Sequence, residues 1–233
     1  KQKMKVLIAD KIAEEGIELL RQHTDVVIKI GLKPEELKAM IGDYDALIVR
    51  SQTEVAAEII ESGEKLKVIG RAGVGTDNID VNAATRKGIV VVNAPTANTV
   101  SAAEHTIALM LALSRNVPQA NDQLKSGKWQ RGKLMGIELR NKTLGIVGLG
   151  NVGSEVAKRA QAFEMRVIAY DPFVSTNYAR KLKLDLVSLD QLLEQSGFIT
   201  LHVPLTATTK ELIGAEKLAK IKPTARIINC ARG

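Results

Sequence analysis

One stretch decides the fold of this chain: Lys142-Thr143-Leu144-Gly145-Ile146-Val147-Gly148-Leu149-Gly150-Asn151-Val152-Gly153. It is an apolar run typical of a buried strand, followed by three glycines with the spacing G-x-G-x-x-G. A helical pattern then covers Ser154 to Phe163, and a second apolar run, Arg166 to Tyr170, ends at Asp171. Strand, glycine turn, helix, strand and acid stand in the order that a dinucleotide-binding unit requires.

Each part of this stretch has its own expected role. Gly148 permits the tight turn, Gly150 lets a pyrophosphate approach the backbone, and Gly153 lets the helix pack closely on the strand. The helix N-terminus would direct unpaired N–H groups and partial positive charge at the phosphates. Asp171, 18 residues after Gly153, would accept hydrogen bonds from an adenosine ribose. The alternative, a glycine turn that serves only helix–strand packing, is weaker because the flanking elements and the distal acid agree.

Length and composition favour an ordinary globular protein with two domains. The chain has 233 residues, of which 45% are hydrophobic and 25% charged. Its one cysteine, Cys230, excludes an internal disulfide and predicts a reducing, cytoplasmic setting. We expect no membrane span, because the most apolar helical pattern, Ala102 to Leu113, is short and contains Glu104 and His105.

The net charge of +7 raises the question of nucleic-acid binding. Lysines and arginines are scattered among acids, and aromatic residues make up only 3%, so the sequence offers no stacking platform. We therefore expect no nucleic acid as a partner. An anionic cofactor and substrate, or a solvated surface, explain the charge.

The first part of the chain alternates strand and helix patterns. Helical patterns, one of them Glu54 to Glu61, separate five apolar runs, which favours a parallel α/β sheet covered on both faces. The predicted strands are Lys5–Asp10, Asp25–Ile30, Ala46–Val49, Lys67–Gly70 and Ile89–Asn93.

Ligands of such sheets bind beyond the carboxyl ends of the strands. Arg50 and Ser51 follow one predicted strand, and the glycine-rich segment Arg71–Asn78 follows the next. Its backbone N–H groups could cradle an anion. A tight turn with solvated arginines is an equal alternative from these residues alone.

A short connector, Ala94–Asn98, marks the predicted boundary between domains 1–98 and 99–233. A long helix is expected over Val100–Arg115, with Ser101 and Glu104 as a capping box. A second helix, Gln119–Ser126, precedes a polar segment with Trp129 and Arg131. Further strands are predicted at Leu186–Val187, Phe198–Val203 and Ala225–Cys230.

Together these motifs resemble the D-isomer-specific 2-hydroxyacid dehydrogenases. The resemblance implies a flavodoxin-like substrate-binding domain over 1–98, a Rossmann domain over 99–233 that is incomplete at its C-terminal end, and a cleft between them. It also implies NAD, and a homodimer or higher homo-oligomer held largely by the Val100 helix region. The matching stretches are Ile48–Ser51, Arg71–Asp80, Gly145–Gly153, Tyr170–Pro172, Leu201–Thr206 and Asn229–Gly233.

By this resemblance, Arg232 matches the catalytic arginine that holds the substrate carboxylate and polarises its 2-oxygen. A permanently charged, planar fork suits that task. The loop Gly73, Val74 and Gly75 matches one that donates N–H groups to the same carboxylate. Anion-binding positions of family members with a phosphorylated substrate match Arg50, Ser51, Arg71 and Arg131. Cofactor contacts match Gly148, Gly150, Asn151, Val152, Gly153, Asp171, Val203, Pro204, Cys230, Ala231 and Arg232.

The chain departs from the family at the general base. The family's histidine–glutamate pair lies beyond the position that matches Gly233, and this chain has only His23, His105 and His202. We expect His23 to be solvated, His105 to serve packing or an interface, and His202 to be non-catalytic. The chain is therefore expected to be an inactive fragment of an enzyme.

Three functions stay open at this point. The first is NAD-dependent oxidation of a small, phosphorylated 2-hydroxy acid, with no metal ion involved. The second is turnover of an unphosphorylated acid such as glycerate or hydroxypyruvate. The third, from another class, is a non-catalytic protein of this fold that senses NAD.

Overall fold

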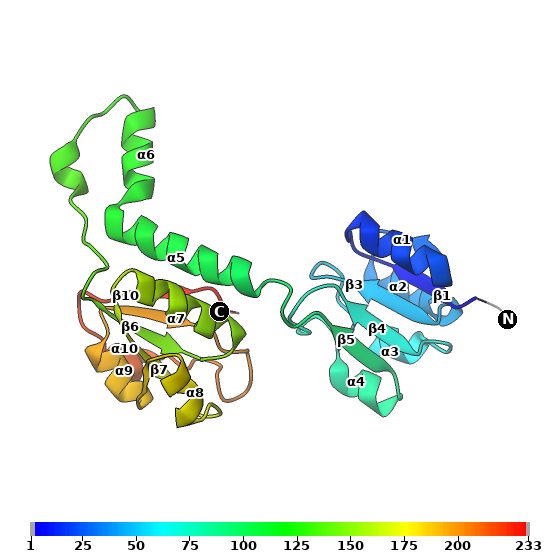
Figure 1. The fold of residues 1–233 in the computed structure, drawn as a ribbon. Coiled ribbons are helices and arrows are strands. Elements are labelled where there is room, and N and C mark those ends of the chain that lie inside the picture. The colour runs from blue at the N-terminus through cyan, green and yellow to red at the C-terminus, as the bar shows by residue number, and fades with distance from the viewer. Residues whose placement is uncertain (1–2, 232–233) are drawn as a thin grey trace. The chain divides into compact units, whose positions relative to one another are not determined.

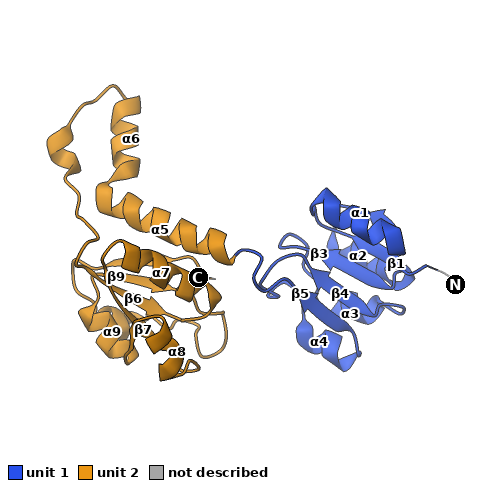
Figure 2. Ribbon diagram, in the orientation of Figure 1, with its two compact units in different colours: residues 1–98 blue, residues 99–233 orange. Residues whose placement is uncertain are grey.

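The computed structural model describes residues 3–231. The chain divides into two compact units, residues 1–98 and residues 99–233, here called unit 1 and unit 2 (Figure 2). Each contains a five-stranded parallel sheet with helices, which confirms the predicted α/β architecture (Figure 1). No helix among the described residues is long and apolar enough to cross a membrane.

Unit 1 has the strand order β2-β1-β3-β4-β5, which is the order of flavodoxin-like folds. The central strand, β3, and its neighbour β1 are short and mostly apolar, as expected for strands buried on both faces. Pro34 opens α2, and the Asp80 side chain caps α4 by accepting from Ala83 N at 2.8 Å. The elements are β1 (Lys5–Ile8), α1 (Glu14–His23), β2 (Asp25–Ile28), α2 (Pro34–Met40), η1 (Ile41–Asp43), β3 (Ala46–Val49), α3 (Ala57–Ser62), β4 (Val68–Arg71), α4 (Val81–Arg86) and β5 (Val90–Asn93).

Unit 2 has the strand order β10-β9-β6-β7-β8, which corresponds to five of the six strands of the Rossmann order, with the first strand, β6, at the centre. Helix α5 packs on α7, and α6 with η2 projects away from the sheet (Figure 1). The elements are α5 (Thr99–Arg115), α6 (Val117–Lys125), η2 (Arg131–Leu134), β6 (Thr143–Val147), α7 (Asn151–Ala162), β7 (Arg166–Tyr170), α8 (Thr176–Lys181), β8 (Asp185–Leu186), α9 (Leu189–Gln195), β9 (Phe198–Leu201), α10 (Ala215–Leu218) and β10 (Arg226–Asn229).

Two local predictions were wrong. The capping box fails because α5 begins at Thr99, which places Ser101 inside the helix; Glu104 instead pairs with Arg159 at 3.4 Å. The helix expected from Glu54 begins only at Ala57, because Val55 forms an isolated parallel bridge with Ile79. Several strands are also shorter at their ends than expected.

Candidate dinucleotide and anion sites

The glycine turn of unit 2 needs two of its glycines for its own packing. Gly148 has a φ of +93°, and a Cβ there would lie 2.7 Å from the His202 carbonyl oxygen. A Cβ on Gly153 would lie 2.1 Å from the Gly148 carbonyl oxygen. Both neighbours are backbone atoms, so no side chain can move aside. These glycines bring the turn against the end of β9 and against α7.

Gly150, unlike Gly148 and Gly153, is not required to be glycine by packing within the chain. A Cβ there would meet no atom within 4 Å, and its backbone is extended, with φ −75° and ψ −157°. It immediately precedes α7, and no described side chain caps that helix. The first N–H groups of α7, at Asn151 and Val152, are therefore available beside an open space. This cradle fits a pyrophosphate.

Asp171 is fixed beside the same turn. Its Oδ2 accepts a hydrogen bond from Leu149 N (2.8 Å), and its Oδ1 accepts one from Phe173 N (2.9 Å). A carboxylate has about four acceptor sites in total. Two acceptor sites therefore remain for ribose hydroxyl groups. The carboxylate is also held in one orientation at the end of the second strand, where dinucleotide-binding domains have the acid that binds the ribose.

Helix α8 is tied to the turn through two hydroxyl groups. Ser154 Oγ donates to the Leu149 carbonyl oxygen (3.3 Å) and shares a hydrogen bond of 3.1 Å with the Tyr178 hydroxyl. Ser154 of α7 thus links the turn to α8.

His202 is unsuited to be a general base. Burial lowers the pKa of its imidazole from 6.5 to about 4, so the ring is neutral at pH 7 and weakly basic. Its Nε2 is 2.9 Å from Thr200 Oγ1. His23 and His105 are exposed, on α1 and α5. His105 is therefore not buried by packing within the described residues.

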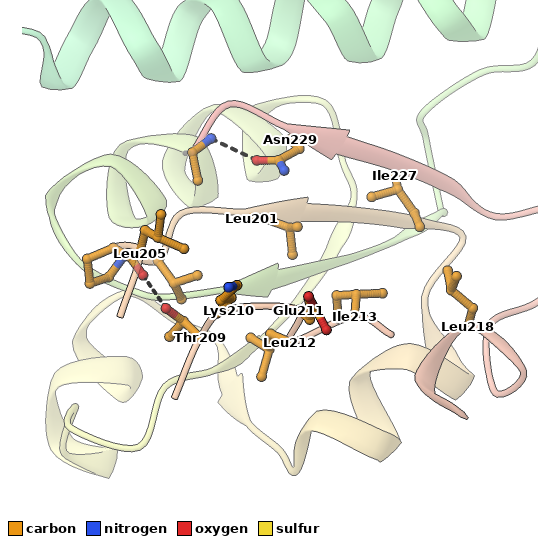
Figure 3. A pocket seen from close by; sticks show the side chains of 13 residues that line it. Leu201, Leu205, Thr209, Lys210, Glu211, Leu212, Ile213, Leu218, Ile227 and Asn229 are labelled. Carbon is orange, nitrogen blue, oxygen red and sulfur yellow. Dashed lines mark hydrogen bonds between the residues drawn. The ribbon is translucent and has the colours of Figure 1, made fainter. Parts of the chain in front are cut away.

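A cavity of about 550 Å³ lies against β9 and β10 (Figure 3). Three predicted cofactor contacts, Val203, Pro204 and Ala231, contribute to its wall, which is otherwise mostly apolar. The glycine turn and Asp171 do not line it. The cavity therefore includes these three predicted cofactor contacts but not the glycine turn, for which phosphate binding is predicted.

The last predicted residues lie at the end of β10. Cys230 is a free thiol, half-buried against the core of unit 2. Ala231 N donates to Asn229 Oδ1 at 2.9 Å, which turns the chain after the strand. Arg232 lies outside the described residues.

In unit 1, the candidate anion-binding residues follow adjacent strands. β3 and β4 pair in parallel with Val49 opposite Arg71, so Arg50 and Arg71 lie at one edge of the sheet. Ser51 is exposed, like Arg50. The Arg71 side chain folds over Gly73, where a Cβ would lie 1.8 Å from its guanidinium nitrogen. Arg71 Nε is buried and has no hydrogen-bond partner among residues 3–231.

The glycine-rich loop after β4 is anchored by main-chain and amide contacts. Gly73 N donates to the Arg71 carbonyl oxygen, and Ala94 N donates to the Gly73 carbonyl oxygen. The Asn93 side chain holds the Val74 carbonyl oxygen at 2.5 Å. These hydrogen bonds hold the backbone of the loop that contains Val74 and Gly75. The remaining predicted cation, Arg131, is exposed on η2 and belongs to unit 2.

The sequence did not predict the roles of two residues in unit 1. Asp10 is buried at the end of β1, and Asn78 lies in the loop after β4; both bind the turn that carries Arg50. A carboxylate directly after an apolar strand was the available signal for Asp10. Their partners are 25 to 43 residues away, which no local pattern reveals.

Comparison with known proteins gives consistent results. Residues 107–233 match the family described as D-isomer specific 2-hydroxyacid dehydrogenase, NAD binding domain. D-3-phosphoglycerate dehydrogenase from Archaeoglobus fulgidus is 55% identical over 99% of this chain and 44% of its own length. The same enzyme from Synechocystis is 53% identical over 98% of this chain and 41% of its own length. The chain thus spans about two fifths of these relatives.

A solved structure is similar in both sequence and fold. Cofactor (NAD⁺)-bound 3-phosphoglycerate dehydrogenase from Entamoeba histolytica is 35% identical, with a TM-score of 0.81. The alignment covers 99% of this chain and 72% of that one.

Proposed function

Because this chain belongs to the D-isomer specific 2-hydroxyacid dehydrogenases, we propose that it serves the NAD-dependent oxidation of 3-phospho-D-glycerate to 3-phosphohydroxypyruvate, a step of serine synthesis. The observation that carries this proposal is the identity of more than half to phosphoglycerate dehydrogenases over 98–99% of the chain. A cytoplasmic location is part of the same proposal.

The cofactor belongs to unit 2, whose matched part is the NAD-binding domain of the family. The α7 N-terminus and Gly150 would hold the pyrophosphate, and Asp171 the adenosine ribose. When bound, NAD supplies the acceptor for a hydride. Further contacts are proposed for Asn151, Val152, Val203, Pro204, Cys230 and Ala231.

The substrate carries a carboxylate and a phosphate, so it needs several cations. Arg50 and Arg71 supply two at one edge of the unit 1 sheet, and Arg131 is proposed to supply a third, from a partner subunit. The backbone N–H groups of Val74 and Gly75 and the guanidinium of Arg232 are proposed to hold the carboxylate; the Gly73 N–H already donates to the Arg71 carbonyl oxygen. Arg232 would also polarise the 2-oxygen, so that the alcohol proton leaves more easily.

Removal of that proton requires a base, and a positioned base contributes roughly 10²–10⁴-fold to the rate. Each histidine of the chain is either exposed or held neutral with a low pKa. We therefore propose that the 233-residue chain, if it folds by itself, binds NAD weakly and turns over essentially no phosphoglycerate.

The projecting α6–η2 segment supports a homo-oligomer. Its large apolar side chains are exposed: Val117 by 52%, Leu124 by 56%, Trp129 by 73% and, just after η2, Met135 by 86%. Apolar surface of this kind marks an association site. We propose that a second copy covers it.

The test is NADH production by the full-length protein with 3-phospho-D-glycerate and with D-glycerate. We expect turnover of the phosphorylated acid, and we expect Arg131→Ala to raise its KM far more than the KM for D-glycerate. Equal effects on both acids would instead favour an unphosphorylated substrate. NAD binding without turnover of any 2-hydroxy acid would favour a sensor.

A further inference from the structure

The turn Arg50–Thr53, which follows β3, is held on one side by a buried carboxylate. Asp10 is only 1% exposed. Its Oδ2 accepts hydrogen bonds from the backbone N–H groups of Arg50 (2.6 Å) and Thr53 (3.2 Å), and its Oδ1 accepts one from Thr53 Oγ1 (2.7 Å). Hydrogen bonds to an ionised acceptor are about twice as strong as neutral ones. Asp10 therefore fixes both ends of the turn.

Asn78 binds the same two residues from the carbonyl side. Its Nδ2 donates to the carbonyl oxygens of Arg50 and Thr53, both at 2.6 Å. Because both partners are acceptors, the nitrogen must be the amide atom that faces them. The other amide atom, Oδ1, is buried with no hydrogen-bond partner in the described part of the chain. Among the described residues, the Asn78 side chain therefore holds the turn through its two Nδ2 hydrogen bonds.

We propose that Asp10 and Asn78 are positioning residues that hold the Arg50–Thr53 turn and so fix the direction in which Arg50 meets the substrate; this rests on the proposed function. Arg50 and Thr53 are bound at both N–H and C=O, and Ser51 and Gln52 stay exposed between them.

The place of this turn in the sheet supports the same role. β1 and β3 are neighbours at the point where the strand order of unit 1 reverses, which is where open parallel sheets bind ligands. The Arg50 guanidinium also donates to the Lys11 carbonyl oxygen at 3.3 Å, next to Asp10. Asn78 belongs to the loop that contains Gly73–Gly75, so it joins the two loops proposed to bind the anion.

Matched variants separate positioning from general stability. Asp10→Ala removes three hydrogen bonds, whereas Asp10→Asn can keep an oxygen toward the two N–H groups and an amide toward Thr53 Oγ1. Asn78→Ala removes two bonds, and Asn78→Asp sets a carboxylate against two carbonyl oxygens. Thr53→Val removes only the hydroxyl, and it serves if Asp10→Ala does not fold.

The experiment measures, for the full-length protein, the KM for 3-phospho-D-glycerate and the KM for NAD. It also measures hydrogen exchange at the backbone amides of Arg50 and Thr53. Because small misplacements of a binding group can cost up to ~10²-fold, we expect Asp10→Ala and both Asn78 variants to raise KM for 3-phospho-D-glycerate about tenfold or more. The KM for NAD should not change, and Asp10→Asn should restore most of the loss. The Arg50 and Thr53 amides should exchange faster in Asp10→Ala and remain protected in Asp10→Asn.

Equal increases of both KM values, or unchanged KM values with both amides exposed, would overturn the positioning role. If the wild-type protein does not oxidise 3-phospho-D-glycerate, the proposed function fails instead. The exchange measurement needs no substrate and still decides the matter: amides as protected in Asp10→Ala as in wild type would overturn the proposal.

Discussion

The two units build their strand-end loops by different means. Unit 2 forms its turn from backbone atoms: Gly148 and Gly153 allow contacts that no side chain could replace, and one carboxylate, Asp171, is added. Unit 1 uses side chains, with Asp10 and Asn78 holding the turn from which Arg50 extends. Both candidate sites lie where the strand order of their sheet reverses, but the one in unit 2 offers N–H groups and the one in unit 1 offers cations.

The ligands proposed for the two units would explain this difference. A dinucleotide is long, and its pyrophosphate can lie along a helix N-terminus without a cation. A small acid with two anionic groups has less surface to contact, so strong charge-assisted hydrogen bonds must supply its affinity. We therefore expect substitutions in unit 2 to act through the backbone and those in unit 1 to act through side-chain direction.

The largest effect should come from the glycines. Gly153→Ala places a Cβ against a backbone oxygen, so we expect unit 2 to lose about 1–3 kcal/mol of unfolding free energy, or more. Gly73→Ala in unit 1 meets only the end of the flexible Arg71 side chain, which can swing away. Urea unfolding followed by circular dichroism measures both. Equal losses would contradict the contrast between the two units.

Acid should destabilise unit 2 through His202. The pKa of this residue is about 4 in the folded state and near 6.5 when unfolded, so the unfolded state binds more protons between these values. The free energy of unfolding is therefore not reduced by His202 above about pH 6.5. It falls as the pH decreases below this value, by about 2 kcal/mol at pH 5.

His202→Gln should remove this part of the pH dependence, as measured by unfolding at pH 7 and pH 5. His23→Gln in unit 1 is the control, because that ring is exposed. An unchanged pH dependence in His202→Gln would show that another group titrates in this range.

Cofactor preference should depend on Asp171. Its carboxylate would repel the extra phosphate of NADP, and the following residues, Pro172 and Phe173, carry no charge. We expect NAD to bind at least about tenfold more tightly than NADP, or ~1.4 kcal/mol, and Asp171→Ala to narrow the gap. Calorimetry with both cofactors measures the preference, and equal affinities in wild type would contradict it.

The sequence predicted the parts of the molecule that local patterns determine. The glycine turn, both sheets and the place of Asp171 follow from residues close together in the chain. The start of α5 did not, because Ser101–Glu104 has the spacing of a capping box inside a helix that begins at Thr99. The roles of Asp10 and Asn78 depend on partners in other strands' loops, so only tertiary structure reveals them.

The central claim is that unit 2 binds NAD and unit 1 does not. It can be tested directly by titrating NAD into the wild-type chain, Gly150→Val and Arg50→Ala. In Gly150→Val the new side chain enters open space, so the fold should persist while it occupies the proposed pyrophosphate position. We predict NAD affinity about tenfold or more below wild type for Gly150→Val, and an unchanged affinity for Arg50→Ala. Melting curves confirm that both variants are folded. Wild-type NAD affinity in Gly150→Val, or an equal loss in Arg50→Ala, would contradict the account.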